Sequence, residues 1–224
     1  FVNYNVADNV SLRGGLMLVP MGIVNEYHEP TTFNGVERPG VDKSIIPSTW
    51  REIGVGVNGR VDDASLKYQA YVMNGFTSGA IGNPHLGGKH GLRSGRQKGA
   101  KSTINKPNFS AKVDYYGIAG LKLGLAGYFG HSQAADETND VVGSDVGINM
   151  IGLDARYVNQ RFSARGQFIQ TYINGAEAYN NYYKGTVSSD LADEMNGWYV
   201  EGAYNLLPLT HQQELTAFVR YENY

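Results

Sequence analysis

Cysteine is absent from the 224 residues of this chain. No disulfide framework can therefore stabilise the fold, and no thiolate can bind a metal ion. Long apolar runs are absent as well, since the longest one, at residues 16–24, is short and contains Pro20, whereas a membrane-spanning helix needs about 18 or more apolar residues. These absences exclude a disulfide scaffold and a transmembrane helix. They leave open a membrane β-barrel, whose strands need only about 9 to 11 residues with apolar side chains at alternate positions.

Charge of one sign is not in large excess either. The chain has 19 Lys and Arg against 21 Asp and Glu, a formal net charge of -2, which gives no indication of a nucleic-acid partner. What the chain does have is 29 Gly and 16 Tyr. Gly tolerates the bends of a barrel, and Tyr suits a boundary between apolar and aqueous surroundings. The composition therefore predicts an all-β fold, as one barrel or sandwich domain or as two small domains.

Alternation of apolar and polar residues predicts ten strands. In residues 52–61, for example, Ile53, Val55 and Val57 alternate with small or polar residues. The expected strands lie at residues 1–6, 11–21, 52–61, 66–76, 109–116, 121–129, 151–157, 162–168, 198–205 and 214–222. Short turns alternate with long loops, which we place at about 23–50, 77–107, 132–147 and 174–196. Every strand keeps its charged residues on one face.

Short turns at one end of a sheet and long loops at the other are typical of outer-membrane barrels. The alternative is a soluble antiparallel barrel or sandwich, whose strands also alternate because one face packs a core. Tyr and Phe at many strand ends favour the membrane barrel, because aromatic girdles mark its interfaces. If the long loops are extracellular, both chain ends lie at the outer rim, whereas a complete barrel starts and finishes on the periplasmic side. We therefore expect residues 1–224 to be part of a single barrel domain with at least about twelve strands.

Three segments carry a resemblance to a known family. Residues 12–22 (LRGGLMLVPMG) resemble a Gly-containing strand motif of the phosphate-selective porin (O and P type) family, and residues 28–30, 33, 37–39 and 46–56 look like the segment that follows there. Residues 218–222 (FVRYE) are similar to a late strand motif of that family. The resemblance is clearest over residues 12–60. It implies a porin of about sixteen strands in the bacterial outer membrane, usually a homotrimer, that passes small hydrophilic solutes or anions.

The charged face of the predicted strands is the expected pore lining. It comprises Arg13, Glu52, Arg60, Lys67, Lys112, Asp114, Lys122, Asp154, Arg156, Arg165, Glu201 and Arg220. In the best-known members of the family, rows of Arg and Lys carry the anion selectivity. Here carboxylates are mixed among the cations, which departs from that pattern and predicts at most a weak preference for anions.

Two loops are candidates for shaping the pore. The 23–50 loop contains Pro30, Pro39 and Pro47, which stiffen its backbone, and it either folds into the lumen or packs outside against a neighbouring subunit. Its constriction candidates are His28, Glu29, Glu37 and Arg38. A His-Glu pair such as His28 and Glu29 can bind a cation, although it more often forms a local hydrogen bond.

The 77–107 loop has no carboxylate. Its candidates for an anion funnel at the pore mouth are Lys89, Arg93, Arg96, Lys98 and Lys101. These cations could also bind the phosphates of lipopolysaccharide, or the loop is simply a solvated Gly- and Lys-rich connection. Nucleic-acid binding is disfavoured because no aromatic residues are interleaved with the charges.

No catalytic constellation is recognisable in the sequence. A nucleophile elbow, a Walker-type glycine loop and the His spacing of zinc proteases are all missing, so we predict neither an enzyme nor a cofactor or metal site. The sequence favours an outer-membrane porin in a lipid bilayer. The alternatives are a structural or partner-docking outer-membrane barrel without significant transport, and a barrel enzyme or lipid-binding barrel.

Overall fold

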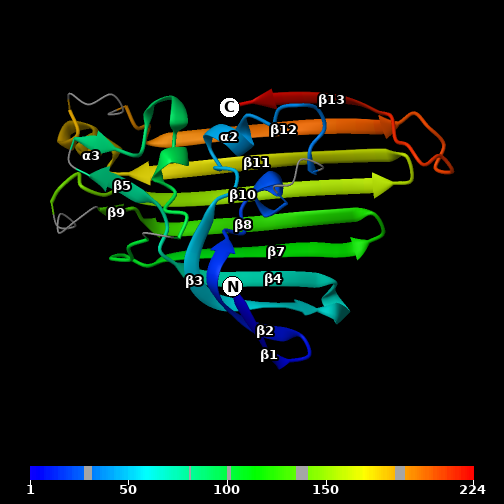
Figure 1. The fold of residues 1–224 in the computed structure, drawn as a ribbon, viewed down its shortest axis with the longest axis horizontal. Helices are drawn as coiled ribbons and strands as arrows, with labels where there is room; N and C mark the ends of the chain where they lie inside the picture. Colours follow the sequence, from blue (N-terminus) through cyan, green and yellow to red (C-terminus); the bar gives the residue numbers. More distant parts are fainter. Residues whose placement is uncertain (28–31, 81, 100–101, 135–140, 185–189) are drawn as a thin grey trace.

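Ten long strands form one antiparallel sheet in this protein. The computed structural model describes residues 1–27, 32–80, 82–99, 102–134, 141–184 and 190–224. In sheet order the strands are β1 (Val2–Ala7), β2 (Val10–Leu18), β3 (Arg51–Val61), β4 (Leu66–Met73), β7 (Asn108–Ile118), β8 (Leu121–His131), β10 (Gly147–Asn159), β11 (Phe162–Asn174), β12 (Glu194–Asn205) and β13 (Thr216–Asn223). Each pairs with its neighbour in that order, so β1 and β13 form the two edges (Figure 1). The prediction of an all-β antiparallel chain with about ten strands is confirmed.

The connections at the two ends of the sheet differ in length. Residues 8–9, 62–65, 119–120, 160–161 and 206–215 make the short connections at one end, and the 62–65 turn includes η2 (Asp62–Ala64). The long connections lie at the opposite end, on the left in Figure 1. Two strands end earlier than predicted. β2 stops at Leu18 because Pro20 has no N–H for a ladder, and β4 stops at Met73, two residues before Gly75, whose φ is positive.

The long connections contain structure that the sequence did not predict. The described residues of the first long connection (19–27 and 32–50), here called the inner segment, include the short helices α1 (Ile23–Glu26) and α2 (Val41–Ser44). The other long connections contain η3 (Gly88–His90), η4 (Arg93–Gly95), α3 (Ala176–Tyr182) and a small sheet of β6 (Asn83–Pro84), β5 (Thr77–Ala80) and β9 (Gln133–Ala134). Among the described residues, no helix has the length and apolar character needed to cross a bilayer.

One face of the large sheet is apolar and uncovered. Val55, Leu125, Leu153 and Val200 point from this outer face and are 51–64% exposed, and Leu125 on β8 pairs with Leu153 on β10. Aromatic residues border the aliphatic band, with Phe109, Phe129, Tyr172 and Trp198 toward the long loops and Tyr115, Tyr157, Phe162 and Tyr204 toward the short turns. Along β7 the two borders are six residue steps apart, from Phe109 to Tyr115, a distance of about 20 Å.

The core lies on the other face, between the sheet and the inner segment. Val24, Ile46 and Trp50 of the inner segment are fully buried. The Trp50 ring stacks on Phe76 with centroids 4.3 Å apart and lies 4.8 Å from the Tyr128 ring. Figure 1 shows the inner segment in front of the sheet, from β3 toward β12. The sheet therefore packs its core on its charged face and leaves its apolar face open.

Candidate pore lining and the inner segment

The strand registers bring charged residues into rows on the inner face. Arg156 on β10 pairs with Lys122 on β8 and with Arg165 on β11. Arg165 in turn pairs with Glu201 on β12, which pairs with Arg220 on β13. Because paired residues point to the same side of a sheet, these five residues form one charged row across five strands. The alternation that the sequence predicts thus produces a continuous row of charged residues.

Lys112 lies at the centre of a buried charge network. It is 1% exposed, and its Nζ lies 2.5 Å from Oε2 of Glu26, 2.8 Å from Oδ2 of Asp154 and 3.7 Å from Oδ1 of Asp114. Asp114 also binds Lys122, whose Nζ is 3.1 Å from its Oδ2. A buried ammonium group is tolerated only when carboxylates surround it. Glu26 belongs to α1, so this network fastens the inner segment to β7.

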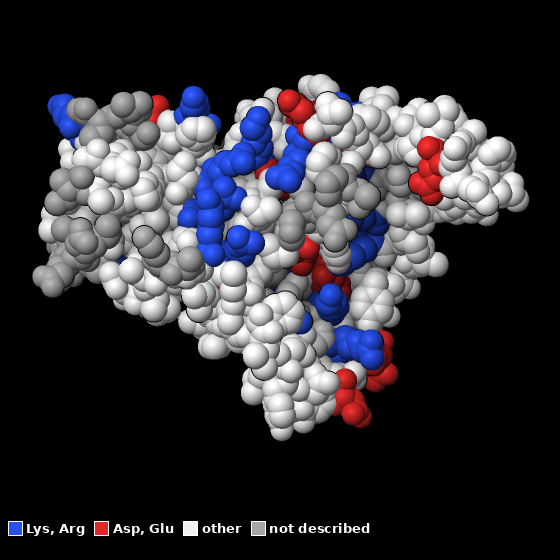
Figure 2. All heavy atoms as spheres, viewed as in Figure 1, with Lys and Arg blue, Asp and Glu red and all other residues white. Residues whose placement is uncertain are grey.

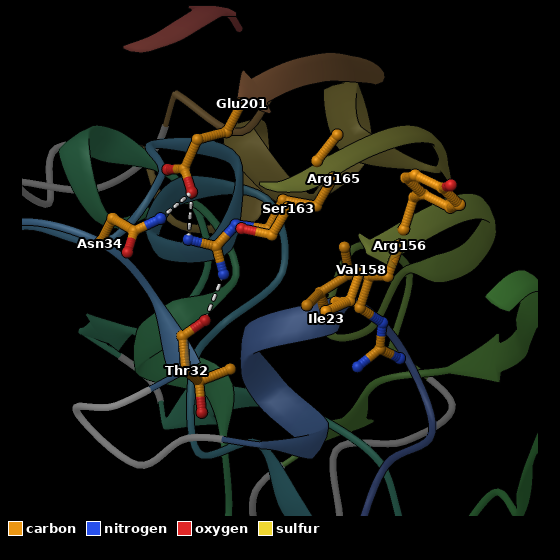
Figure 3. A pocket seen from close by; sticks show the side chains of 10 residues that line it. Ile23, Thr32, Asn34, Arg156, Val158, Ser163, Arg165 and Glu201 are labelled. Carbon is orange, nitrogen blue, oxygen red and sulfur yellow. Dashed lines mark hydrogen bonds and ion pairs between the residues drawn. The ribbon is translucent and has the colours of Figure 1, made fainter. Parts of the chain in front are cut away.

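A second cluster of charged residues binds the inner segment at Thr32 and Asn34. Arg165 donates from Nη1 to the carbonyl oxygen of Thr32 and from Nη2 to Oε1 of Glu201. Asn34 donates to the same Glu201 oxygen at 2.8 Å, and Arg220 Nη1 lies 3.4 Å from Oε2. Figure 3 shows the Arg165 guanidinium between Thr32, Asn34 and Glu201. A pocket of about 260 Å³ lies between this cluster and the short-turn ends of β10 and β11.

Hydrogen bonds from amide and carboxylate side chains join the two ends of the inner segment to each other and to the sheet. Asn25 accepts a hydrogen bond from the backbone N–H of Trp50 at 2.6 Å and donates to the carbonyl oxygen of Val19 at 2.9 Å. Glu52 accepts from Nε1 of Trp50 at 3.0 Å and from Nδ2 of Asn74 at 2.8 Å. Sequence reasoning missed Asn25 and Asn74, because nothing in their local sequence indicates a partner far along the chain.

Arginines from three segments gather near the long-loop end of the inner face. Arg96 donates to the carbonyl oxygens of Arg93 and Ser48 and to Oγ1 of Thr49, which ties the 74–107 connection to the inner segment. Burial lowers the pKa of the Arg96 guanidinium, and the nearby charges of Arg93, Arg51 and Arg38 lower it further, whereas Glu52 raises it. Figure 2 shows that Lys and Arg side chains are prominent on this face.

We call Arg38, Arg51, Arg93 and Arg96 the arginine cluster. It combines one predicted constriction residue and two predicted funnel residues with Arg51, which sequence reasoning missed because it stands alone at the start of β3. The other funnel candidates differ. Lys89 and Lys98 are exposed, and Lys101 lies outside the described residues.

The remaining candidates lie at the margins of the inner face. Arg13 donates to the Tyr71 hydroxyl at 3.1 Å, and Arg60 pairs with Asp62 at 3.3 Å near the short turns, where both are exposed. Lys67 is exposed on β4.

Of the constriction candidates in the inner segment, Glu37 accepts a hydrogen bond from Arg220 through its backbone oxygen, 3.2 Å away, while its side chain is exposed. Arg38 lies over the Phe33 ring at 5.7 Å. His28 and Glu29 fall outside the described residues.

Much of the predicted lining is not open to water in this chain. Lys112, Asp114, Asp154 and Glu201 are at most 7% exposed, because the inner segment lies over them and supplies Glu26 and Asn34 as partners. The inner segment therefore covers the predicted lining residues of the middle strands.

No family model matches the chain. An uncharacterized protein of Aquifex aeolicus (strain VF5) is 30% identical to it over 235 residues, which cover 100% of this chain and 50% of that protein. The chain thus spans about half the length of the curated relative that it matches.

Proposed function

We propose that this chain is part of an outer-membrane porin, a water-filled β-barrel channel for the passive diffusion of small hydrophilic solutes or ions. The observation that carries the proposal is the inverted polarity of the sheet. Its open face is aliphatic with aromatic borders, while its covered face holds the charges. A soluble protein buries the apolar face of a sheet, since each exposed apolar side chain forgoes about 1.5–3 kcal/mol of burial. Lipid contact is the environment that suits such a face.

Closure of the barrel requires strands beyond this sequence. β1 and β13 are sheet edges with no further strand beside them among the described residues, and a lipid-facing sheet cannot leave its edges unpaired. The relative is about twice as long as the chain, which is enough for a comparable number of further strands. We propose a single barrel in the bacterial outer membrane, in contact with bilayer and lipopolysaccharide, and a homotrimer as in the family that the sequence resembles.

The inner segment then narrows the lumen. Its described residues cross the inner face from Glu26, beside Lys112 on β7, to Gly40, whose N–H lies 2.7 Å from Oε2 of Glu222 on β13. Solutes would pass beside it, near the arginine cluster on the long-loop side. The charge network below the segment is balanced once Arg156, which lies 3.6 Å from Asp154, is counted with Lys112 and Lys122 against the three carboxylates. We therefore propose a weak preference for anions set by the arginine cluster rather than a strong phosphate filter.

Conductance of the full-length protein in planar bilayers tests the proposal. We expect stepwise, ohmic channels whose reversal potential in a salt gradient indicates a modest anion preference. An absence of channels from folded protein would reject the pore and favour a structural or partner-docking barrel. Strong cation selectivity would reject the role of the arginine cluster.

A further inference from the structure

Asp42 is a buried carboxyl group without a cation partner. It lies in α2, is 0% exposed, and none of the ion pairs among the described residues includes it. Its Oδ1 accepts a hydrogen bond from Nε2 of Gln167 at 3.1 Å, whereas its Oδ2 is buried without any hydrogen-bond partner. An ionised carboxylate in such a place is strongly unfavourable. The site therefore suits the neutral acid.

Gln167 makes this carboxyl group part of the attachment of the inner segment. While its Nε2 donates to Asp42, its Oε1 accepts the backbone N–H of Ile23 at 2.6 Å. One side chain on β11 thus holds both α1 and α2. The hydroxyl group of Ser48 also donates to the Asp42 carbonyl oxygen. Any change at Asp42 acts directly on the contact between the inner segment and the sheet.

The surroundings of Asp42 set the pH at which it ionises. Burial raises its pKa from the ordinary 3.8 to about 7. The hydrogen bond from Gln167, the positive charge of Arg165 on β11 and the backbone N–H of Val24 act in the opposite direction and lower the pKa. The negative charge of Asp154 on β10 raises the pKa of Asp42 further. The hydroxyl group of Tyr199 on β12 also interacts electrostatically with Asp42.

We propose that Asp42 is a pH-dependent latch, whose neutral acid holds the inner segment against β11 and whose ionisation loosens that contact. In a loosened segment Asp42 regains water and its ordinary affinity for protons. The docked form therefore binds the extra proton between about pH 4 and about pH 7, and docking weakens as the pH rises through that window, by up to about tenfold per pH unit. Above about pH 7, Asp42 causes no further change in docking. On the proposed function, the channel is more open near neutral pH than in acid.

Thiol labelling tests the latch independently of conduction, and the absence of cysteine from this chain makes it practical. Val24→Cys places a thiol at a fully buried site on α1, and Val36→Cys places one at a 99% exposed site of the same segment. Each is reacted with a pyridyl disulfide, in membranes containing the full-length protein without other cysteines. The ratio of the two rates cancels the intrinsic pH dependence of the reagent and the thiol.

We expect this ratio to rise by about tenfold or more from about pH 4.5 to about pH 7 and then to level off. With Asp42→Asn the ratio should be low and constant, whereas Glu37→Gln, which removes an exposed carboxylate of the same segment, should leave the rise intact. A ratio that is flat in the unaltered background overturns the latch, whether or not Asp42→Asn folds. An equal rise with Asp42→Asn overturns it too. Loss of conductance with an intact rise would reject the porin alone.

Discussion

Lys112 on β7 and Glu26 on α1 form a buried ion pair, with 2.5 Å between Nζ and Oε2, although 86 residues separate them in the chain. The pair joins a strand of the large sheet to the inner segment. Asp154 shares the same ammonium group at 2.8 Å. This one lysine therefore bridges a carboxylate of the sheet and a carboxylate of the segment that covers it.

Replacing Lys112 by Met should lower the free energy of unfolding by roughly 3–5 kcal/mol, because it leaves buried carboxylates without their cation. Urea unfolding of the full-length protein in lipid vesicles measures the change. Lys67→Met is the matched control, since Lys67 is an exposed lysine of the same inner face, and we expect a change below about 0.5 kcal/mol. Equal effects of the two substitutions would show that the network does not stabilise the fold.

The sequence predicts the strands because each has one apolar face. Leu121, Leu123 and Leu125 point outward from β8, and this period-2 pattern requires no knowledge of the rest of the chain. The register follows from the short turns. The inner face is harder to predict, because what covers it is decided by partners far apart in sequence, such as Gln167 and Ile23, 144 residues apart.

Helices α1 and α2 are also difficult to predict from the sequence. Each has only four residues, too few for a helical period to be visible in the sequence. They are fixed instead by contacts with the sheet, through Glu26 and Asp42. For this reason the sequence leaves two positions open for the 23–50 loop, while the structure lays its described residues on the charged face.

Gly56 lets β3 lie close to β4. A Cβ atom at this position would be 2.0 Å from the carbonyl oxygen of Ala70 and 2.7 Å from Cα of Tyr71, so the backbone would have to move. We expect Gly56→Ala to lower the free energy of unfolding by about 1–3 kcal/mol. Gly202→Ala on β12 is the control, since nothing lies within 4 Å of a Cβ there. Urea midpoints for the two variants should differ clearly, and similar midpoints would contradict the close approach.

The stability of the protein should depend on pH through Asp42. Its pKa is about 7 in the folded state and ordinarily 3.8, so the native state binds more protons than the unfolded state between these values. The free energy of unfolding therefore falls by up to about 1.4 kcal/mol per pH unit as the pH rises from about 4 to about 7. Asp42→Asn should remove this part of the slope. Unfolding curves over that range check it, and an unchanged slope in the variant would contradict the buried acid.

The arginine cluster should set ion preference. Arg51→Glu and Arg93→Glu each reverse one charge beside Arg96, and we expect each to reduce the permeability ratio of chloride to potassium by about twofold or more. Lys89→Glu makes the same change of charge at an exposed position outside the cluster, so its effect should be much smaller. Reversal potentials in a salt gradient measure the ratio. Three equal shifts would indicate net charge alone and would reject a localised filter.

Leu125 distinguishes a lipid-facing sheet from a water-exposed one. It lies in the middle of the outer aliphatic band, paired with Leu153, and is 54% exposed. Against lipid, Leu125→Arg should cost about 2–4 kcal/mol, because an arginine near the bilayer midplane loses its hydration. Against water the same change at an exposed site should cost less than about 0.5 kcal/mol.

Leu209→Arg is the control for this comparison, because Leu209 is equally apolar and exposed but lies in the short 206–215 connection, outside the band. Urea unfolding from lipid vesicles gives both values. A large cost at Leu125 with little cost at Leu209 is the result that a membrane-spanning wall requires. Equal, small costs at the two sites would mean that the apolar face does not contact lipid, and the porin proposal would then lose the observation on which it rests.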